Sequence, residues 1–328
     1  MSDQFKALVL NQEGDNFTRE VKSVDKSFLK HGDVTIKVDY SDLNFKDGMI
    51  LKNGGRLVKE FPHIPGIDFA GKVLESENPK FKVGDEVYGC AGGIAGTDGA
   101  LADYMLVDTD LMALKPKSLS MREAAALPLV SITAWEALHD KLQIKAGDNV
   151  LIHGATGGVG HIAIQLAKYF GATVSATSTP RNIALAVTLG ADHIINATEE
   201  SVDDYVNHYT SGIGFDAVFD TVAGDNIQKS FQAVKLNGGV ATILPVEDVL
   251  QVALKSLSFH SVLMLIPLVH GLNRVSHGKI LAKIAELVDE EALKPLLDEQ
   301  EFTLWQVADA HAYVESGKAV GKVVLTAE

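Results

Sequence analysis

The chain is poor in sulfur, with Cys90 as the single cysteine among its 328 residues. One cysteine excludes an internal disulfide, because a disulfide joins two thiols. Proteins without disulfides are typical of reducing compartments. We therefore expect this protein to act in the cytoplasm.

Positive charge and long apolar runs are also scarce. The 29 Lys and Arg residues are outnumbered by 43 Asp and Glu residues, and the formal net charge is −14. A protein that holds nucleic acid or an anionic membrane surface needs a basic face, so we expect neither partner. The longest apolar stretch, residues 257–269, contains His260 and Pro267 and is too short to cross a bilayer. We interpret it as a buried strand or a subunit contact, and we expect the main partner to be a small molecule.

Glycines gather in one informative stretch, residues 153–160, which reads His-Gly-Ala-Thr-Gly-Gly-Val-Gly. The apolar run at 149–152 predicts a buried strand before it, and the apolar positions from 162 to 170 predict a helix after it. Backbone amides at such a junction, together with the helix dipole, hold the pyrophosphate of a dinucleotide. The residues that we expect at the pyrophosphate are Ala155, Thr156, Gly157, Gly158 and Val159.

The surrounding pattern supports this interpretation. The stretch follows Gly-x-Gly-x-x-Gly with alanine at the first glycine position, and more predicted strands alternate with helix-like segments, at 172–177, 215–220 and 239–244. This alternation predicts an α/β domain with a doubly wound parallel sheet. Thr221 and Val222 follow the strand at 215–220, where such sheets bind ligands, so we expect them beside a ribose of the cofactor. The alternative is a glycine turn in an ordinary α/β domain.

The end of the second predicted strand indicates which dinucleotide binds. NAD sites place a carboxylate there for the ribose 2′-hydroxyl, whereas a 2′-phosphate needs cationic and hydroxyl donors. This segment offers Thr177, Ser178 and Arg181, and no carboxylate follows until Asp192. NADP(H) is therefore preferred, with a forked Arg181–phosphate pair assisted by either hydroxyl. A solvated arginine at a helix start is the alternative for Arg181.

The length predicts two domains, because one hydrophobic core rarely serves more than about 300 residues. The first hundred residues are mostly predicted strands separated by glycine and proline turns, which favours a small barrel-like domain. A last predicted strand at 321–325 rejoins it. We expect a substrate domain from residues 1–120 and 266–328, and a nucleotide domain from residues 121–265.

Several segments together resemble the medium-chain dehydrogenase/reductase superfamily, in its zinc-free quinone oxidoreductase and enoyl reductase branch, which includes acryloyl-CoA reductase-like proteins. The resemblance covers the whole chain and rests on the glycine stretch and on residues 43–47, 65–71, 82–89, 189–192 and 321–325. It implies a Rossmann domain and a GroES-like β-barrel domain. It also implies NADPH-dependent hydride transfer to a quinone, or to the C=C bond of an enone or enoyl thioester. A homodimer formed through residues 259–265 is a further implication.

Zinc alcohol dehydrogenases of this superfamily resemble the chain in fold, but the positions of their metal ligands look like Asn44 and Gly66-Ile67-Asp68 here. One cysteine and scattered histidines offer no cluster of about four zinc ligands. We therefore expect no catalytic metal. Alcohol oxidation needs a Lewis acid, whereas hydride addition to an electron-poor alkene or quinone needs only orientation and polarisation.

The resemblance also suggests catalytic residues. Asn44 would lie near the nicotinamide amide or the substrate carbonyl, and the alternative is a turn-forming asparagine. Lys255 resembles a proposed proton donor, with a solvated lysine as the alternative. Tyr88 follows a strand expected at the cleft, or is a barrel aromatic. Thr133 resembles a threonine beside the nicotinamide, or packs as a helix residue. Water is a further source of the proton.

The resemblance is incomplete at one position. Many relatives carry a tyrosine in or just after the first active-site loop, where this chain has Phe45 and Met49. The missing hydroxyl mildly favours a second hypothesis, a non-catalytic interaction or structural protein that binds NADPH. Lys255 favours the enzyme. The two hypotheses differ in whether any activated alkene is turned over.

Overall fold

The computed structural model describes residues 3–14, 16–44, 47–48, 50 and 57–327. Phe45 and Met49 lie outside the described residues. The chain divides into two compact units: Met1–Leu129 with Leu265–Glu291 and Leu297–Glu328, and Val130–Met264 with Ala292–Leu296. The first boundary lies at Leu129, later than the predicted residue 120, because helix α2 (Met121–Ala125) packs on strands of the first unit.

The second unit contains a six-stranded parallel sheet in the order β10-β9-β8-β11-β12-β13. From β8 the chain adds β9 and β10 on one side and then β11, β12 and β13 on the other side. This switch in strand order makes the sheet doubly wound, as the alternating pattern predicts. The predicted strands correspond to β8 (Asn149–His153), β9 (Thr173–Ser178), β11 (Phe215–Asp220) and β12 (Val234–Thr242). The short edge strand β10 (His193–Asn196) lies outside the predicted strands. The other edge strand, β13 (Ser258–Ser261), lies within the stretch 257–269 that we interpret from the sequence as a buried strand or a subunit contact, and its residues are half-buried or exposed.

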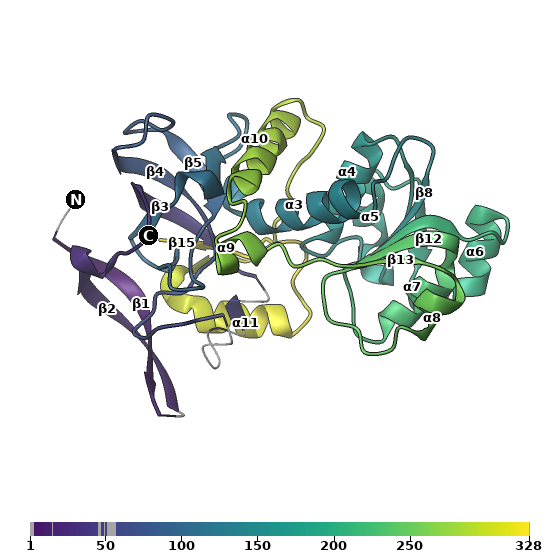
Figure 1. The fold of residues 1–328 in the computed structure, drawn as a ribbon, viewed down its shortest axis with the longest axis horizontal. Helices are drawn as coiled ribbons and strands as arrows, with labels where there is room; N and C mark the ends of the chain where they lie inside the picture. Colours follow the sequence, from purple (N-terminus) through teal and green to yellow (C-terminus); the bar gives the residue numbers. More distant parts are fainter. Residues whose placement is uncertain (1–2, 15, 45–46, 49, 51–56, 328) are drawn as a thin grey trace. The chain divides into compact units, whose positions relative to one another are not determined.

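Helices cover this sheet because their apolar faces need burial (Figure 1). Helix α4 packs on β8 and β9, and α7 packs on β11 and β12. The core includes Phe215 and Phe231, both at most 1% exposed. The helices of this unit are α4 (Gly160–Tyr169), α5 (Ile183–Thr188), α6 (Val202–Thr210), α7 (Asn226–Ala233) and α8 (Leu250–Leu254), while α3 (Pro128–Trp135) begins in the first unit and ends in this one.

The first unit is mostly β, with sheet order β14-β15-β3-β4-β5-β7 and β6 paired with β3. Strand β15 comes from the last part of the chain and pairs antiparallel with β3, where Leu325 is opposite Ser41. Strands β1 and β2 form a separate two-stranded sheet whose Phe5 and Val9 are buried. The strands are β1 (Gln4–Glu13), β2 (Asn16–Asp25), β3 (Val34–Asp42), β4 (Asp68–Ser76), β5 (Glu86–Cys90), β6 (Tyr104–Val107), β7 (Met112–Leu114), β14 (Phe302–Thr303) and β15 (Val324–Thr326).

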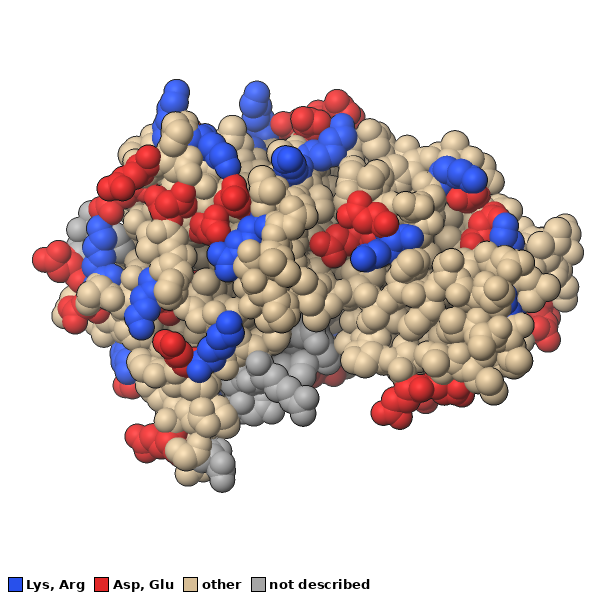
Figure 2. Space-filling view, in the orientation of Figure 1, with Lys and Arg blue, Asp and Glu red and all other residues tan. Residues whose placement is uncertain are grey.

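Three more helices belong to the first unit: α9 (Ile266–His270), α10 (Val275–Asp289) and α11 (Val307–Glu315). Helix α10 packs against β5 and β7 and buries Ile280, Leu281 and Ile284. On the face drawn in Figure 2, acidic and basic side chains are interspersed. Across the residues that the structure describes, every helix is too short or too polar to cross a membrane.

Candidate functional site

The glycine stretch forms a tight turn between β8 and α4. Gly154 has φ +85°, which side-chain-bearing residues rarely adopt, and its carbonyl accepts a hydrogen bond from the Gly157 amide at 3.0 Å. A Cβ atom on Gly160 would lie 2.0 Å from the Gly154 carbonyl oxygen, which is closer than atoms pack. Both positions therefore require glycine, and the left-handed conformation falls on Gly154 rather than on Ala155.

This turn fits the pyrophosphate of a dinucleotide. Thr156, Gly158 and Val159 come directly before the first turn of α4, where backbone amides and the helix dipole favour an anion. Gly157 is exposed, so the backbone there is open to approach. Ala155 is fully buried under the turn.

Two threonines, Thr177 in β9 and Thr221 directly after β11, hold the turn in place. The Thr177 hydroxyl accepts a hydrogen bond from the Gly154 amide at 3.1 Å and lies 3.2 Å from His153 Nδ1. The Thr221 hydroxyl donates to the His153 carbonyl at 2.6 Å. Burial lowers the pKa of His153 to about 4, so this imidazole is neutral near pH 7. The Thr177 side chain, expected at a phosphate, thus contacts the backbone of the turn.

Ser178 and Arg181 lie at the end of β9, next to the turn. Ser178 is the buried last residue of the strand, and Arg181 is exposed on a short 3₁₀ helix (Pro180–Asn182). Asn182 Nδ2 donates to the Thr156 hydroxyl at 3.0 Å, which joins this helix to the glycine turn. Ser178 and Arg181 are therefore on the same side of the sheet as the turn.

Asp192 lies at the amino-terminal ends of the strands, opposite the ends that carry the glycine turn. Its carboxylate accepts from the Val174 amide at 2.7 Å, near the amino end of β9, and pairs with Lys168 at 2.7 Å. The partners hold the pKa of Asp192 below its usual value despite some desolvation. This carboxylate is committed to an ion pair away from the end of β9 where the ribose of a bound dinucleotide is expected.

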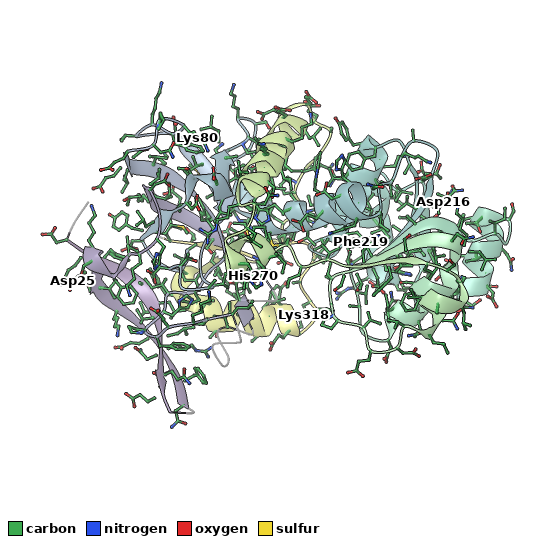
Figure 3. All side chains as sticks on the ribbon, in the orientation of Figure 1. Asp25, Lys80, Asp216, Phe219, His270 and Lys318 are labelled. Carbon is green, nitrogen blue, oxygen red and sulfur yellow. The ribbon has the colours of Figure 1, made fainter. Side chains whose placement is uncertain are left out.

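The carboxyl end of β11 carries the remaining predicted cofactor contacts. In Figure 3 the labelled Asp216 and Phe219 mark the amino and carboxyl ends of this strand. Asp220 accepts bonds from the Val222 and Ala223 amides at 3.0 and 2.8 Å, which shapes the loop after the strand. Val222 is 55% exposed on that loop. Thr133 is buried in α3, and its predicted place beside a nicotinamide stays a prediction.

Lys255 is not near the glycine turn within this unit. It precedes β13 at the amino edge of the sheet, where its carbonyl accepts from the Asn237 amide. Its ammonium donates to the carbonyls of Phe231 and Gln232 at 2.9 and 3.0 Å, and to that of Val234. These contacts cap the C-terminus of α7, which favours a cation. These contacts give Lys255 a structural role and do not favour its assignment as proton donor, which stays a prediction.

Tyr88 also has a structural role. It is fully buried in β5, and its hydroxyl donates to the Leu281 carbonyl of α10 at 2.6 Å. Burial raises the pKa of this phenol well above its usual value, which opposes ionisation. The barrel-aromatic alternative therefore describes Tyr88 better than a place in a substrate cleft.

The first unit contains a buried polar cluster around Asn44. The Asn44 side chain accepts a hydrogen bond from Lys322 Nζ at 2.8 Å and donates through Nδ2 to Asp68 at 3.0 Å. Its backbone amide donates to Asp47 at 2.9 Å. Lys322 Nζ also donates to the Leu43 carbonyl at 3.1 Å and lies 2.6 Å from a carboxylate oxygen of Asp42.

Burial shifts the carboxyl groups of this cluster toward the neutral form. Desolvation raises the pKa of Asp68 to about 8 and that of Asp47 to about 7, against the opposing charge of Lys322 and the hydrogen bonds from Asn44. Asp42 pairs directly with Lys322, although burial raises its pKa as well. Near neutral pH the cluster therefore contains the Lys322 ammonium and three carboxyl groups, those of Asp42, Asp47 and Asp68, that are partly protonated.

Asn44 is expected at the site from the sequence, whereas Lys322 is not among the predicted site residues. The available signal was a lysine within the apolar run 321–325, because a charge at a buried strand position needs a partner. Within the described ranges, no group of three or more His, Cys, Asp or Glu residues could hold a metal ion. A catalytic centre without metal stays a prediction at this point.

Two family models match the chain: an alcohol dehydrogenase GroES-like domain over residues 30–117 and a zinc-binding dehydrogenase over residues 189–325. A solved structure, an alcohol dehydrogenase superfamily protein from Novosphingobium aromaticivorans, superposes with a TM-score of 0.91 at 34% identity and covers 99% of this chain and 100% of that one.

Curated relatives are oxidoreductases by name. The chain is 38% identical to 2-methylene-furan-3-one reductase of Solanum lycopersicum, over 80% of this chain and 63% of that enzyme's length. It is 33% identical to the chloroplastic NADPH-dependent alkenal/one oxidoreductase of Arabidopsis thaliana, over 90% of this chain and 72% of that one. It is 32% identical to a chloroplastic quinone-oxidoreductase homolog of Spinacia oleracea, over 90% of each chain. The glycine turn, the doubly wound sheet, the GroES-like unit and these matches show that the chain is an oxidoreductase of the medium-chain dehydrogenase/reductase superfamily.

Proposed function

We propose that the protein is a zinc-independent, NADPH-dependent reductase of electron-poor C=C bonds in enones or enoyl thioesters. The observation that carries this proposal is the Asn44 cluster. At positions that resemble zinc ligands, the chain brings an amide and a carboxyl group with a raised pKa, and Lys322 Nζ lies 2.8 Å from the amide oxygen. A zinc ion and an ammonium at that spacing repel each other, so this donor set does not fit the metal.

The donor set formed by Asn44, Asp68 and Lys322 favours alkene reduction over alcohol oxidation. Alcohol oxidation by hydride transfer passes through alkoxide character on the substrate oxygen, which a Lewis acid stabilises. Reduction of a conjugated alkene instead places negative charge on a carbonyl oxygen, which hydrogen-bond donors stabilise. The names of the tomato and Arabidopsis relatives describe reductases of such alkenes, and this supports the proposal. The spinach relative's name keeps a quinone as the second candidate acceptor.

NADPH is the proposed cofactor, and it would supply the hydride. The turn from Gly154 to Gly160 would hold the pyrophosphate, while Arg181 and Ser178 would receive the 2′-phosphate. Asp192 is committed to Lys168 at the amino-terminal ends of the strands, so it does not repel a phosphate at the end of β9. Arg is suited to this place because its planar guanidinium binds a phosphate through two hydrogen bonds.

The chain's own residues would orient the acceptor and stabilise charge. Asn44 would donate a hydrogen bond to the carbonyl oxygen on which charge collects. We assign the final proton to water, because the ammonium of Lys255 and the hydroxyl of Tyr88 are bonded to backbone carbonyls. Asp47 would order the loop by accepting a hydrogen bond from the Asn44 backbone amide.

A homodimer in the cytoplasm completes the proposal. β13 is an edge strand of the second unit's sheet, and Leu263, which follows it, is 43% exposed. An edge strand with nearby apolar surface suits pairing with a second copy. A solution mass of 35.1 kDa, that of one chain, would contradict the dimer.

Turnover of defined acceptors tests the proposal. NADPH oxidation is followed at the nicotinamide absorbance with a simple enone, crotonyl-CoA, acryloyl-CoA and 1,4-benzoquinone, and NADH replaces NADPH as the control. We expect turnover of the conjugated alkenes with preference for NADPH. Turnover of the quinone alone would establish the second candidate acceptor. Tight NADPH binding without turnover of any acceptor would support the non-catalytic hypothesis and overturn the proposal.

A further inference from the structure

The Lys322 ammonium is the most unusual group in the first unit. Its side chain is 5% exposed, and burying a charge is costly unless every donor finds a partner. Its three protons match three partners: the Asp42 carboxylate at 2.6 Å, the Asn44 side-chain oxygen at 2.8 Å and the Leu43 carbonyl at 3.1 Å. Asp42 balances the charge, while the Leu43 carbonyl and Asn44 Oδ1 accept the remaining protons. The bond to Asn44 Oδ1 also has a consequence for the Asn44 side chain.

That bond determines which way the Asn44 amide points. An ammonium has only donors, so the atom that faces Lys322 must be the amide oxygen. The Nδ2 atom then faces Asp68 and donates to its Oδ2 atom at 3.0 Å. Oδ2 can accept this bond when Asp68 is ionised and also when its proton is on Oδ1. A flipped amide would place two donors against each other at 2.8 Å. Lys322 and Asp68 therefore hold Asn44 in one orientation.

The same bond makes Asn44 a better donor. A cation bonded to the amide oxygen draws electron density toward that oxygen and makes the Nδ2 protons more acidic, because linked hydrogen bonds polarise one another. Nδ2 carries two protons, and Asp68 accepts one of them. The second belongs to a nitrogen that is already oriented and polarised.

We propose that Lys322 is a positioning residue for the reduction, acting through Asn44 so that the second Nδ2 proton bonds the carbonyl oxygen of the conjugated acceptor. This inference rests on the proposed function. It specifies the substrate class further, because the acceptor must bear a carbonyl oxygen next to the reduced bond. Preorganised donors of this kind lower the barrier by stabilising charge that develops during hydride transfer.

The test separates action through Asn44 from simple charge balance. Lys322→Met alone leaves Asp42 buried without a cation, so it is combined with Asp42→Asn to keep the charges balanced. We expect this double variant to fold, to bind NADPH as the wild type does, and to lose about tenfold or more in kcat, as expected when a charged hydrogen bond is removed. When Lys322→Met and Asp42→Asn are introduced into the Asn44→Ala variant, we expect no further fall in kcat. Equal losses in both backgrounds would overturn the positioning role.

Two controls complete the experiment. Lys115→Met removes another buried lysine of the first unit, with a side chain 6% exposed and bonds to the Pro116 and Leu119 carbonyls, and we expect kcat to stay unchanged. If the Met pair does not fold, Lys322→Gln with Asp42→Asn supplies a neutral donor and should lose less kcat than Asn44→Ala. If Lys322→Gln with Asp42→Asn lowers kcat by the same factor in the Asn44→Ala background, the inference is overturned. Absence of turnover in the wild type would instead refute the proposed function, and this inference with it.

Discussion

Gly160→Ala tests how closely the glycine turn controls cofactor binding. The new Cβ atom would lie 2.0 Å from the Gly154 carbonyl oxygen and 2.8 Å from its carbon. Ordinary contacts between such atoms are near about 3.5 Å, so the turn must open by more than about 1 Å. Overpacking of this kind costs about 1–3 kcal/mol, while alanine regains up to about 1 kcal/mol of helix propensity. We expect lower stability and at least a tenfold weaker NADPH affinity.

The assay is a fluorescence titration with NADPH, accompanied by chemical unfolding of the same samples. Gly190→Ala is the matched control, because Gly190 has φ +91° and the nearest atom to the new Cβ, Lys168 Cγ, is 4.0 Å away. The control should lose about 1 kcal/mol of stability through backbone strain and keep its NADPH affinity. An unchanged NADPH affinity in Gly160→Ala would refute the reasoning that the turn cradles the pyrophosphate.

Three further predictions follow from the two units. Arg181→Ala should weaken NADPH binding about tenfold or more and leave NADH binding unchanged, as measured by titration with both cofactors; equal losses would refute a 2′-phosphate contact. Lys255→Ala should lower the free energy of unfolding by about 1 kcal/mol through loss of the α7 cap and leave kcat unchanged, whereas a large fall in kcat would restore the proton-donor role. Burial raises the pKa of Asp68 from its usual value of 3.8 to about 8, so the native state holds the extra proton and stability should fall as pH rises between these values. Asp68→Asn should flatten that slope in unfolding curves, and an unchanged slope would contradict it.

The glycine turn and most of the doubly wound sheet are predictable from the sequence because their signals are local. Apolar runs such as 149–152 and the glycines after them lie next to each other in the chain and determine their own geometry. The edge strand β10 is harder to predict, because it has four residues and an incomplete apolar pattern. The bounds of β13 are also harder to predict, because its four residues are only part of the apolar stretch 257–269. Local pattern is strong in the centre of the sheet and weak at its edges.

The candidate site is less predictable because its contacts are remote in sequence. Asn44 is recognisable by resemblance, but its contact with Lys322 joins residues 278 positions apart. Tyr88 and Lys255 are plausible proton donors by residue type, yet a sequence does not show that each donates to a backbone carbonyl. Side-chain partners of this kind follow from tertiary packing, which no window of neighbouring residues contains.

The separation of Asn44 and Lys322 also matters while the chain is being made. Asp42 and Asn44 are synthesised early, but the ammonium that neutralises the one and orients the other arrives only with residue 322. Strand β15, which pairs with β3 beside this cluster, arrives with it. Until then a nascent chain has a carboxylate with no cation to accompany its burial, which disfavours premature closure of the first unit. Folding of this unit and assembly of its polar cluster are thereby coupled to the synthesis of a residue that lies 278 positions after Asn44.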